Sequence, residues 1–266
     1  MYATKYASRT KDTSTIESPW MRCLLHGEID SLKTTTAALF GTPEQTRIIL
    51  TREEDQLLPI INRGYKFLQS TNGAELTEMM AYCDQIWPDW AKHPEPYLVI
   101  DDMTKGNALV FEDSDTDDKG NAVKDIRRRY GITMESIAPA FNAVNRKSIH
   151  ICLTALSKVA EGKITKEENV IPDLPPSIGN FIMSDYSFIF FLNRQRPVAS
   201  RMLTRMDFMA ITEYDEKAKK DVTYRRYFFA RNKVPSEVAE TALQQYEPAN
   251  LRAVWDKVKA ARKVAK

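Results

Sequence analysis

Residues 185–205 have the sequence DYSFIFFLNRQRPVASRMLTR, in which an almost unbroken apolar run is followed by four arginines. A strand formed by residues 186–191 would be apolar on both faces, which predicts a strand buried in the core. Phe188 and Phe190 are therefore expected in the core. Tyr186, at the start of the run, is the best candidate for stacking on a nucleic-acid base.

The arginines that follow this run predict contacts to a polyanion. Guanidinium groups lining a groove neutralise phosphates, and aromatic faces stack on bases. If residues 198–209 form a helix after Pro197, Arg201 and Arg205 lie four positions apart on one face. The predicted RNA-binding residues are Arg194, Arg196, Arg201, Arg205, Arg225, Arg146, Lys147 and Tyr186.

Length and composition predict a folded protein with a sizeable core. The chain has 266 residues, of which 43% are hydrophobic and 10% aromatic. No run of roughly 18 apolar residues and no apolar segment near the N-terminus is present, so neither a membrane span nor a secretory signal is expected. Cys23, Cys83 and Cys152 are far apart and lie in apolar patterns, which predicts buried thiols.

Charge is distributed unevenly along the chain. Residues 1–125 carry 13 Lys and Arg against 21 Asp and Glu, a net charge of −8, whereas residues 126–266 carry 25 against 15, a net charge of +10. Such a split is typical of a basic surface for an acidic partner or of complementary faces between subunits. The first 18 residues have no periodicity and predict a flexible arm.

Motifs of common enzyme classes are not found. The chain has only 9 glycines and lacks GxGxxG, GxxxxGK[ST], GxSxG and HExxH, and its three histidines have no neighbours typical of metal ligands. No catalytic residue, metal or cofactor is therefore predicted.

Hydrophobic periodicity favours a mainly α protein with small β elements, an α+β fold with a helical core. The expected helices are 52–70, 74–87, 132–144, 145–162, 235–246 and 248–266. The expected β elements are the runs YLVI and ALVF within residues 96–126 and a hairpin near residues 208–230.

An acidic loop, DSDTDDKGN at residues 113–121, partly matches a calcium-binding pattern. Asp113, Asp115 and Asp117 fit its first three ligand positions, but Asp118 replaces the required glycine and Lys124 the final glutamate. A solvated acidic loop is the favoured interpretation.

The segment YSFIFFLNRQRPVASR, Tyr186 to Arg201, resembles the coat proteins of flexible filamentous plant RNA viruses. Those proteins have a Tyr-x-Phe-x-Phe block, an arginine, a proline and an Ala-x-Arg segment. They place an aspartate between the phenylalanines, where this chain has Ile189. The resemblance covers about 16 residues and implies a mostly helical subunit that packs side by side and holds single-stranded RNA.

The first functional hypothesis is therefore a viral structural protein, without catalysis, that self-assembles and coats single-stranded RNA in the virion and host cytoplasm. Its homo-oligomer would form through the arm and the oppositely charged regions, with an arm at 1–18, an acidic region at 19–125 and a basic region at 126–266. One alternative is a viral matrix-type protein that binds a membrane or a ribonucleoprotein. Another is a metal-dependent enzyme in which Asp101 and Asp102, after YLVI, hold a divalent cation.

Overall fold

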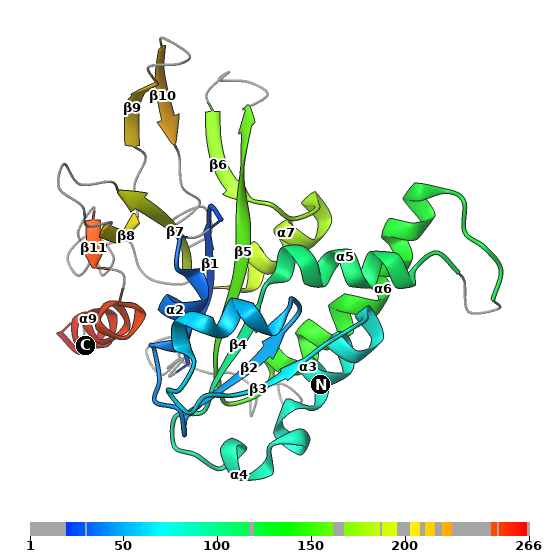
Figure 1. Ribbon diagram of the computed structural model, residues 1–266, viewed down its shortest axis with the longest axis horizontal. Helices are drawn as coiled ribbons and strands as arrows, with labels where there is room; N and C mark the ends of the chain where they lie inside the picture. The colour runs from blue at the N-terminus through cyan, green and yellow to red at the C-terminus, as the bar shows by residue number, and fades with distance from the viewer. Residues whose placement is uncertain are drawn as a thin grey trace, which may run out of the picture.

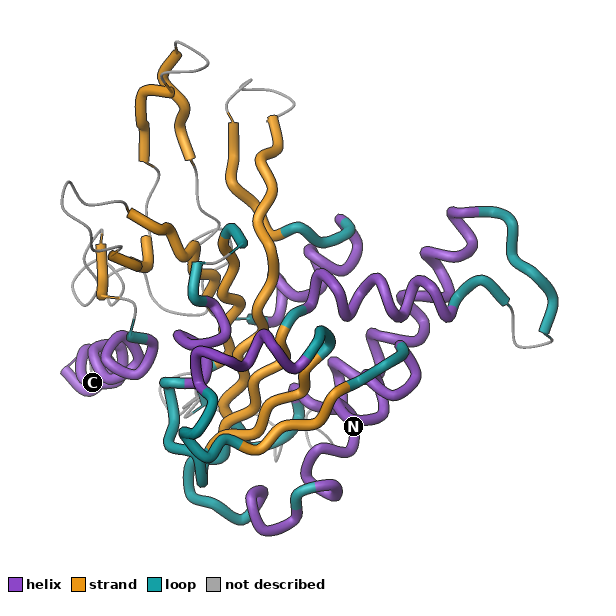
Figure 2. The backbone as a smooth tube through the Cα atoms, in the orientation of Figure 1, coloured by secondary structure: helices purple, strands orange, loops and turns teal. Residues whose placement is uncertain are grey.

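Parallel strands from both the acidic and the basic part of the chain form the centre of the molecule (Figures 1 and 2). The computed structural model describes residues 20–264 except 30, 117–119, 162–167, 187, 196–202, 208–210, 216–219, 225–245 and 249. The parallel strands lie in the order β7-β1-β5-β4-β2-β3. They are β1 (Arg22–Gly27), β2 (Thr46–Leu50), β3 (Lys66–Gln69), β4 (Tyr97–Asp101), β5 (His150–Glu161) and β7 (Phe188–Gln195).

Antiparallel strands extend this sheet. β8 (Leu203–Asp207) pairs with β7, β11 (Tyr246–Pro248) pairs with β8, and β6 (Glu168–Pro172) pairs with the outer part of β5. A separate antiparallel pair, β9 (Ile211–Asp215) and β10 (Lys220–Tyr224), lies within the range 208–230. Both antiparallel pairs, β5–β6 and β9–β10, project from the same end of the sheet (Figure 1).

Helices cover both faces of the sheet. One buried cluster joins α2, η2 and α9 to one face, and a second joins α3, α4, α5, α6 and α7 to the other. The helices are α2 (Lys33–Ala38), the 3-10 helix η2 (Glu54–Ile60), α3 (Gly73–Ile86), α4 (Pro88–Ala91), α5 (Met103–Asp113), α6 (Ile126–Asn145), α7 (Pro176–Asp185) and α9 (Leu251–Val264). The fold is therefore α/β and Rossmann-like.

Residue alternation along the strands explains why both faces are covered. In β4, Tyr97 and Val99 belong to the first cluster, whereas Leu98 and Ile100 belong to the second. All four side chains are fully buried. Because successive side chains of a strand point to opposite faces, an apolar run of this kind needs helices on both sides.

The expected α+β fold with a helical core is wrong. Residues 145–162 were expected to form a helix, but β5 occupies most of them, and the predicted strand ALVF lies inside α5. The expected helix at 52–70 is replaced by η2 and β3. Short apolar runs fit a buried strand and a buried helix equally well, so their periodicity alone does not separate the two.

Several local predictions are confirmed. The predicted helix at 74–87 is α3, whose first turn is capped because the side chain of Asn72 accepts a hydrogen bond from the backbone N–H of Glu75. The helix at 132–144 lies within α6, and YLVI lies in β4. The three cysteines are buried, and the predicted helix at 248–266 contains α9, which buries Leu251, Val254, Trp255 and Val258.

Two further predictions concern the segment 235–246 and membrane-spanning helices. The expected helix at 235–246 lies outside the described residues except for its last position. Among the described residues, none of the helices combines the length and the apolar character needed to cross a bilayer.

His150, the first residue of β5, is an uncharged histidine in the core. It is 1% exposed, and its Nδ1 accepts a hydrogen bond of 2.9 Å from the backbone N–H of Met21. Its ring contacts the rings of Trp20, Phe40 and Trp255. Burial lowers the pKa of His150 from 6.5 to about 4.

This shift predicts an acid-sensitive fold. The folded pKa lies below the unfolded one, so the stabilisation is complete above pH 6.5 and is lost as pH falls to about 4. We expect the free energy of unfolding to fall by roughly 3 kcal/mol between pH 7 and pH 4 from this group. Urea unfolding at several pH values, with His150→Asn as the comparison, measures it. An equally steep pH dependence in the variant would contradict the assignment.

Candidate functional site

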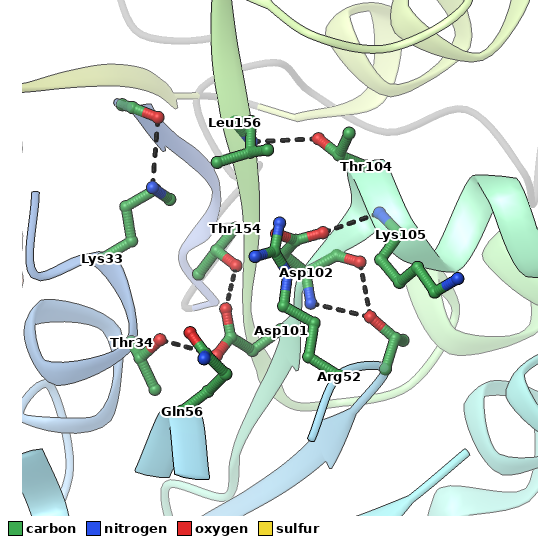
Figure 3. Close-up of polar contacts among 12 residues, drawn as sticks. Lys33, Thr34, Arg52, Gln56, Asp101, Asp102, Thr104, Lys105, Thr154 and Leu156 are labelled. Atoms are coloured by element: carbon green, nitrogen blue, oxygen red, sulfur yellow. Dashed lines mark hydrogen bonds and ion pairs between the residues drawn. The ribbon is translucent and has the colours of Figure 1, made fainter. Parts of the chain in front are cut away.

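The candidate site lies where β1, β2 and β4 end, beside the middle of β5. In open parallel sheets, ligands bind outside the carboxyl ends of the strands, where neighbouring connections leave toward opposite faces. Here the connection after β1 enters α2 on one face, and the connection after β4 enters α5 on the other. Figure 3 shows the polar side chains that meet at this edge.

The loop after β1 has the sequence GEIDSLKT, from Gly27 to Thr34. It matches the phosphate-binding pattern GxxxxGK[ST] at every defined position except one, where Leu32 replaces the second glycine. Gly27 is required by close packing, because a Cβ atom there would lie 2.5 Å from Ser31 Oγ and 2.7 Å from the carbonyl oxygen of Leu192. Leu32 has φ 63° and ψ 30°, the left-handed conformation that favours glycine. The loop thus keeps a glycine-type backbone without the glycine.

Lys33 places a cation in the middle of this loop. Its side chain is largely buried, with the residue 8% exposed, and Nζ donates hydrogen bonds to the carbonyl oxygens of Gly27 (3.1 Å) and Glu28 (2.6 Å). The ammonium group is therefore folded over the loop that carries it. An anion in the pocket would meet this charge directly.

Asp101, the last residue of β4, is a buried carboxylate held by two hydroxyl groups. Thr34 Oγ1 donates to one carboxylate oxygen at 2.6 Å, and the Thr154 hydroxyl of β5 donates to the other. Asp101 is 3% exposed, and burial raises its pKa, while the two hydrogen bonds oppose that rise. The carboxylate thus joins the β1 loop to β4 and β5.

Asp102 follows and is tied to β2. Arg52 Nη2 lies 2.5 Å from Asp102 Oδ2, and the Asp102 side chain is 3% exposed. Thr51 Oγ1 donates to the backbone carbonyl of Asp102 at 2.7 Å. Asp102 also caps α5, because its Oδ1 accepts from the backbone N–H of Lys105 at 2.7 Å. Two adjacent carboxylates are therefore matched by two cations, Lys33 and Arg52.

These groups line one pocket of about 110 Å³. Pockets for whole drug-sized ligands measure about 300–1,000 Å³, so this one has the size of the polar end of a ligand. The charged and polar side chains that line it and can bind a ligand include those of Lys33, Thr34, Arg52, Gln56, Asp101 and Asp102. A pocket of this size, with cations and hydroxyls beside carboxylates, suits a phosphate chain together with a divalent cation.

The oxygen ligands present fit a magnesium ion only in part. Thr34 Oγ1 and the Asp101 carboxylate are hard oxygen donors, the kind that Mg²⁺ prefers. Among the described residues, no three His, Cys, Asp or Glu side chains gather into a metal-binding group. Mg²⁺ commonly takes one or two protein ligands and completes its shell with phosphate oxygens and water, so the site fits a metal that arrives with a phosphate ligand.

The predicted RNA-binding residues are not brought together by the described structure. Tyr186 is 2% exposed at the end of α7, so its ring presents no free face for a base. Lys147 forms an ion pair with Asp84, and Arg146 is exposed at the end of α6. Phe188 and Phe190 are buried in the core, as predicted.

The arginine block is described only in part. Arg194 lies in β7 opposite Thr204, and Arg205 lies in β8 opposite Asn193. Because residues 203–207 form a strand, the expected helix over 198–209 is wrong there. Arg196, Arg201 and Arg225 lie outside the described residues. A continuous RNA-binding groove, and with it the coat and matrix hypotheses, stays a prediction.

Of the residues at the site, the sequence singled out only Asp101 and Asp102. Lys33 and Thr34 were missed because the motif GxxxxGK[ST] was sought with both glycines present. Allowing one mismatch in that motif, after an apolar segment such as RCLLH, would have found the loop. Arg52 and Thr154 carry no local motif.

Comparisons with known proteins add no relative. No protein-family model matches this chain, and no curated protein is significantly similar to it. The geometry of the pocket therefore carries the functional argument by itself.

The conformation of Leu32 predicts an unusual response to glycine. Leu32 and Leu39 are similarly exposed, at 44% and 46%, but Leu39 has φ −71°. Replacing either by glycine loses a similar side chain and adds the same unfolded-state freedom, whereas only Leu32→Gly relieves left-handed strain. We expect Leu32→Gly to be more stable than Leu39→Gly by about 1–2 kcal/mol in urea unfolding. Equal losses would show that the loop lacks this strain.

Proposed function

We propose that this chain binds a nucleoside triphosphate together with Mg²⁺ and hydrolyses its terminal phosphate. One observation carries the proposal: the Thr34 hydroxyl of the GEIDSLKT loop donates to the Asp101 carboxylate at 2.6 Å. In nucleotide-binding proteins with a loop of this pattern, the Ser or Thr after the lysine and an aspartate at the end of a neighbouring strand hold Mg²⁺ together. The same two groups meet here.

The loop and Lys33 would hold the phosphates. Backbone N–H groups of such a loop cradle the phosphate chain, and its lysine reaches the terminal phosphates. Lys33 Nζ now binds two loop carbonyls, at 3.1 Å and 2.6 Å, and can exchange these neutral partners for charged phosphate oxygens. The small pocket then takes the phosphates, and the nucleoside lies outside it.

Thr34 and Asp101 would hold the metal ion. A magnesium ion bound there would supply positive charge that stabilises the negative charge developing on the phosphate oxygens. Thr154 keeps the Asp101 carboxylate oriented through its own hydrogen bond. In the reaction, the oxygen of water bonds to the terminal phosphorus while the bond from phosphorus to the bridging oxygen breaks. The attacking water gives up a proton to the solvent, so the products are a nucleoside diphosphate, inorganic phosphate and a proton.

This proposal departs from the first hypothesis of a non-enzymatic RNA coat and follows the alternative of a carboxylate-containing, metal-dependent enzyme. The alternative located the two aspartates at the end of YLVI. The contacts of the β1 loop with Asp101 support a phosphate ligand in addition to the metal. No contact at the pocket specifies the nucleobase.

Calorimetric titration with ATP and with GTP tests the proposal, each in Mg²⁺ and in EDTA. We expect Lys33→Met to weaken binding at least about tenfold in both conditions, because a charged hydrogen bond contributes about 1.5–3 kcal/mol. Asp101→Asn should weaken binding in Mg²⁺ and have little effect in EDTA, since it removes a metal ligand.

The matched control is Lys66→Met, which removes an exposed lysine of β3 that does not line the pocket. It should bind as the unsubstituted protein does, and circular dichroism should show that all variants are folded. If the unsubstituted protein binds neither nucleotide in Mg²⁺, the proposed function is wrong. If Asp101→Asn weakens binding equally in Mg²⁺ and EDTA, the metal assignment is wrong.

A further inference from the structure

Arg52 connects the pocket wall to the second carboxylate of the site. It follows β2 closely, its side chain is 29% exposed, and it lines the pocket. Its Nη2 lies 2.5 Å from Asp102 Oδ2, and Asp102 is almost completely buried. Arg52 is therefore more accessible to a ligand in the pocket than the carboxylate that it holds.

The guanidinium group of Arg52 has donors to spare. Arginine carries five N–H donors in a planar fork that matches carboxylate and phosphate oxygens. Asp102 is contacted through Nη2, and the buried Nε of Arg52 has no hydrogen-bond partner among the described residues. The guanidinium group thus makes fewer hydrogen bonds than it can, and its exposed part can donate to a phosphate oxygen.

The position of Arg52 relative to Lys33 selects one end of a phosphate chain. Lys33 begins α2 in the connection after β1, Arg52 follows β2, and β4, which ends at Asp101, lies between β1 and β2 in the sheet. A phosphate chain that begins in the β1 loop and passes Asp101 reaches Arg52 last. Figure 3 shows Arg52 next to Asp102, with Lys33 farther away.

From these contacts we infer that Arg52 recognises the terminal phosphate of a nucleoside triphosphate by exchanging its ion pair with Asp102 for that phosphate. This inference rests on the proposed function and adds to it a residue that distinguishes triphosphate from diphosphate. Asp102 keeps the hydrogen bond from the backbone N–H of Lys105 at 2.7 Å when Arg52 leaves. The exchange is favourable only with a ligand more highly charged than a carboxylate, because it leaves Asp102 without its cation.

Titration of Mg²⁺-ATP, Mg²⁺-ADP and the corresponding guanine nucleotides into three variants tests this inference. We expect Arg52→Gln to weaken triphosphate binding about tenfold or more and to change diphosphate binding by less than about twofold. Asp102→Asn should make triphosphate binding tighter, because it removes the competitor for Arg52. Arg63→Gln removes an exposed arginine that does not line the pocket and should change neither affinity.

The double variant Arg52→Gln, Asp102→Asn is the control for misfolding, because it removes the Asp102 carboxylate together with the cation that compensates it. It should melt close to the unsubstituted protein and keep the weakened triphosphate binding. Equal losses of triphosphate and diphosphate affinity in Arg52→Gln would overturn the inference and leave Arg52 a support for Asp102. Unchanged triphosphate binding in Arg52→Gln would overturn it as well, while leaving the proposed function intact. Absence of all nucleotide binding in the unsubstituted protein would instead refute the proposed function.

Discussion

Burying the carboxylate of Asp101 is the constraint on which the functional edge of the sheet depends. An ionised carboxylate in the core is costly unless hydrogen bonds and nearby cations compensate it. Here the compensation comes from other elements: Thr34 from the β1 loop, Thr154 from β5, and the charge of Lys33. The β1 loop must approach β4 for this to happen, and β5 must lie between β1 and β4. The sheet order thus brings together the groups that compensate this buried charge, and Lys33, Thr34 and Asp101 also line the pocket.

The two layers of helices follow from the apolar strands. Strands such as β4 and β1 present fully buried side chains on both faces, so the sheet is stable only when covered twice. The helices and strands differ in how clearly their hydrophobic period can be recognised in the sequence. α9 exposes Asp256 and Lys257 and buries Leu251, Val254, Trp255 and Val258, a helical period that the sequence displays, and the helices at 74–87 and 248–266 were predicted correctly. β5 has no polar face along residues 151–155, and its pattern did not separate a strand from a helix.

The candidate site could be predicted from the sequence only at Asp101 and Asp102, because a pair of acids directly after an apolar run marks a strand end. The residues that contact them could not be predicted from the sequence, for a physical reason. Thr34 and Thr154 lie 67 and 53 positions from Asp101, and only the parallel pairing of β1, β5 and β4 brings them together. The loop was also hard to recognise because Leu32 stands where the motif requires its second glycine. Leu32 has the left-handed backbone conformation typical of glycine, but a motif defined by residue types shows only that the glycine is missing. The prediction of an RNA-binding site at the arginine block rested on local composition, which carries no information on these long-range contacts.

β5 connects the pocket to the projecting β5–β6 pair, in addition to forming part of the core. Over residues 151–156 it is hydrogen-bonded to β1, and from Ser157 onward it pairs with β6 instead. Thr154, which holds Asp101, and Leu156, which lines the pocket, lie just before this change of partner. The projecting β5–β6 pair and the residues that hold Asp101 and line the pocket therefore belong to one unbroken strand, and the pocket borders the point where that strand leaves the parallel sheet.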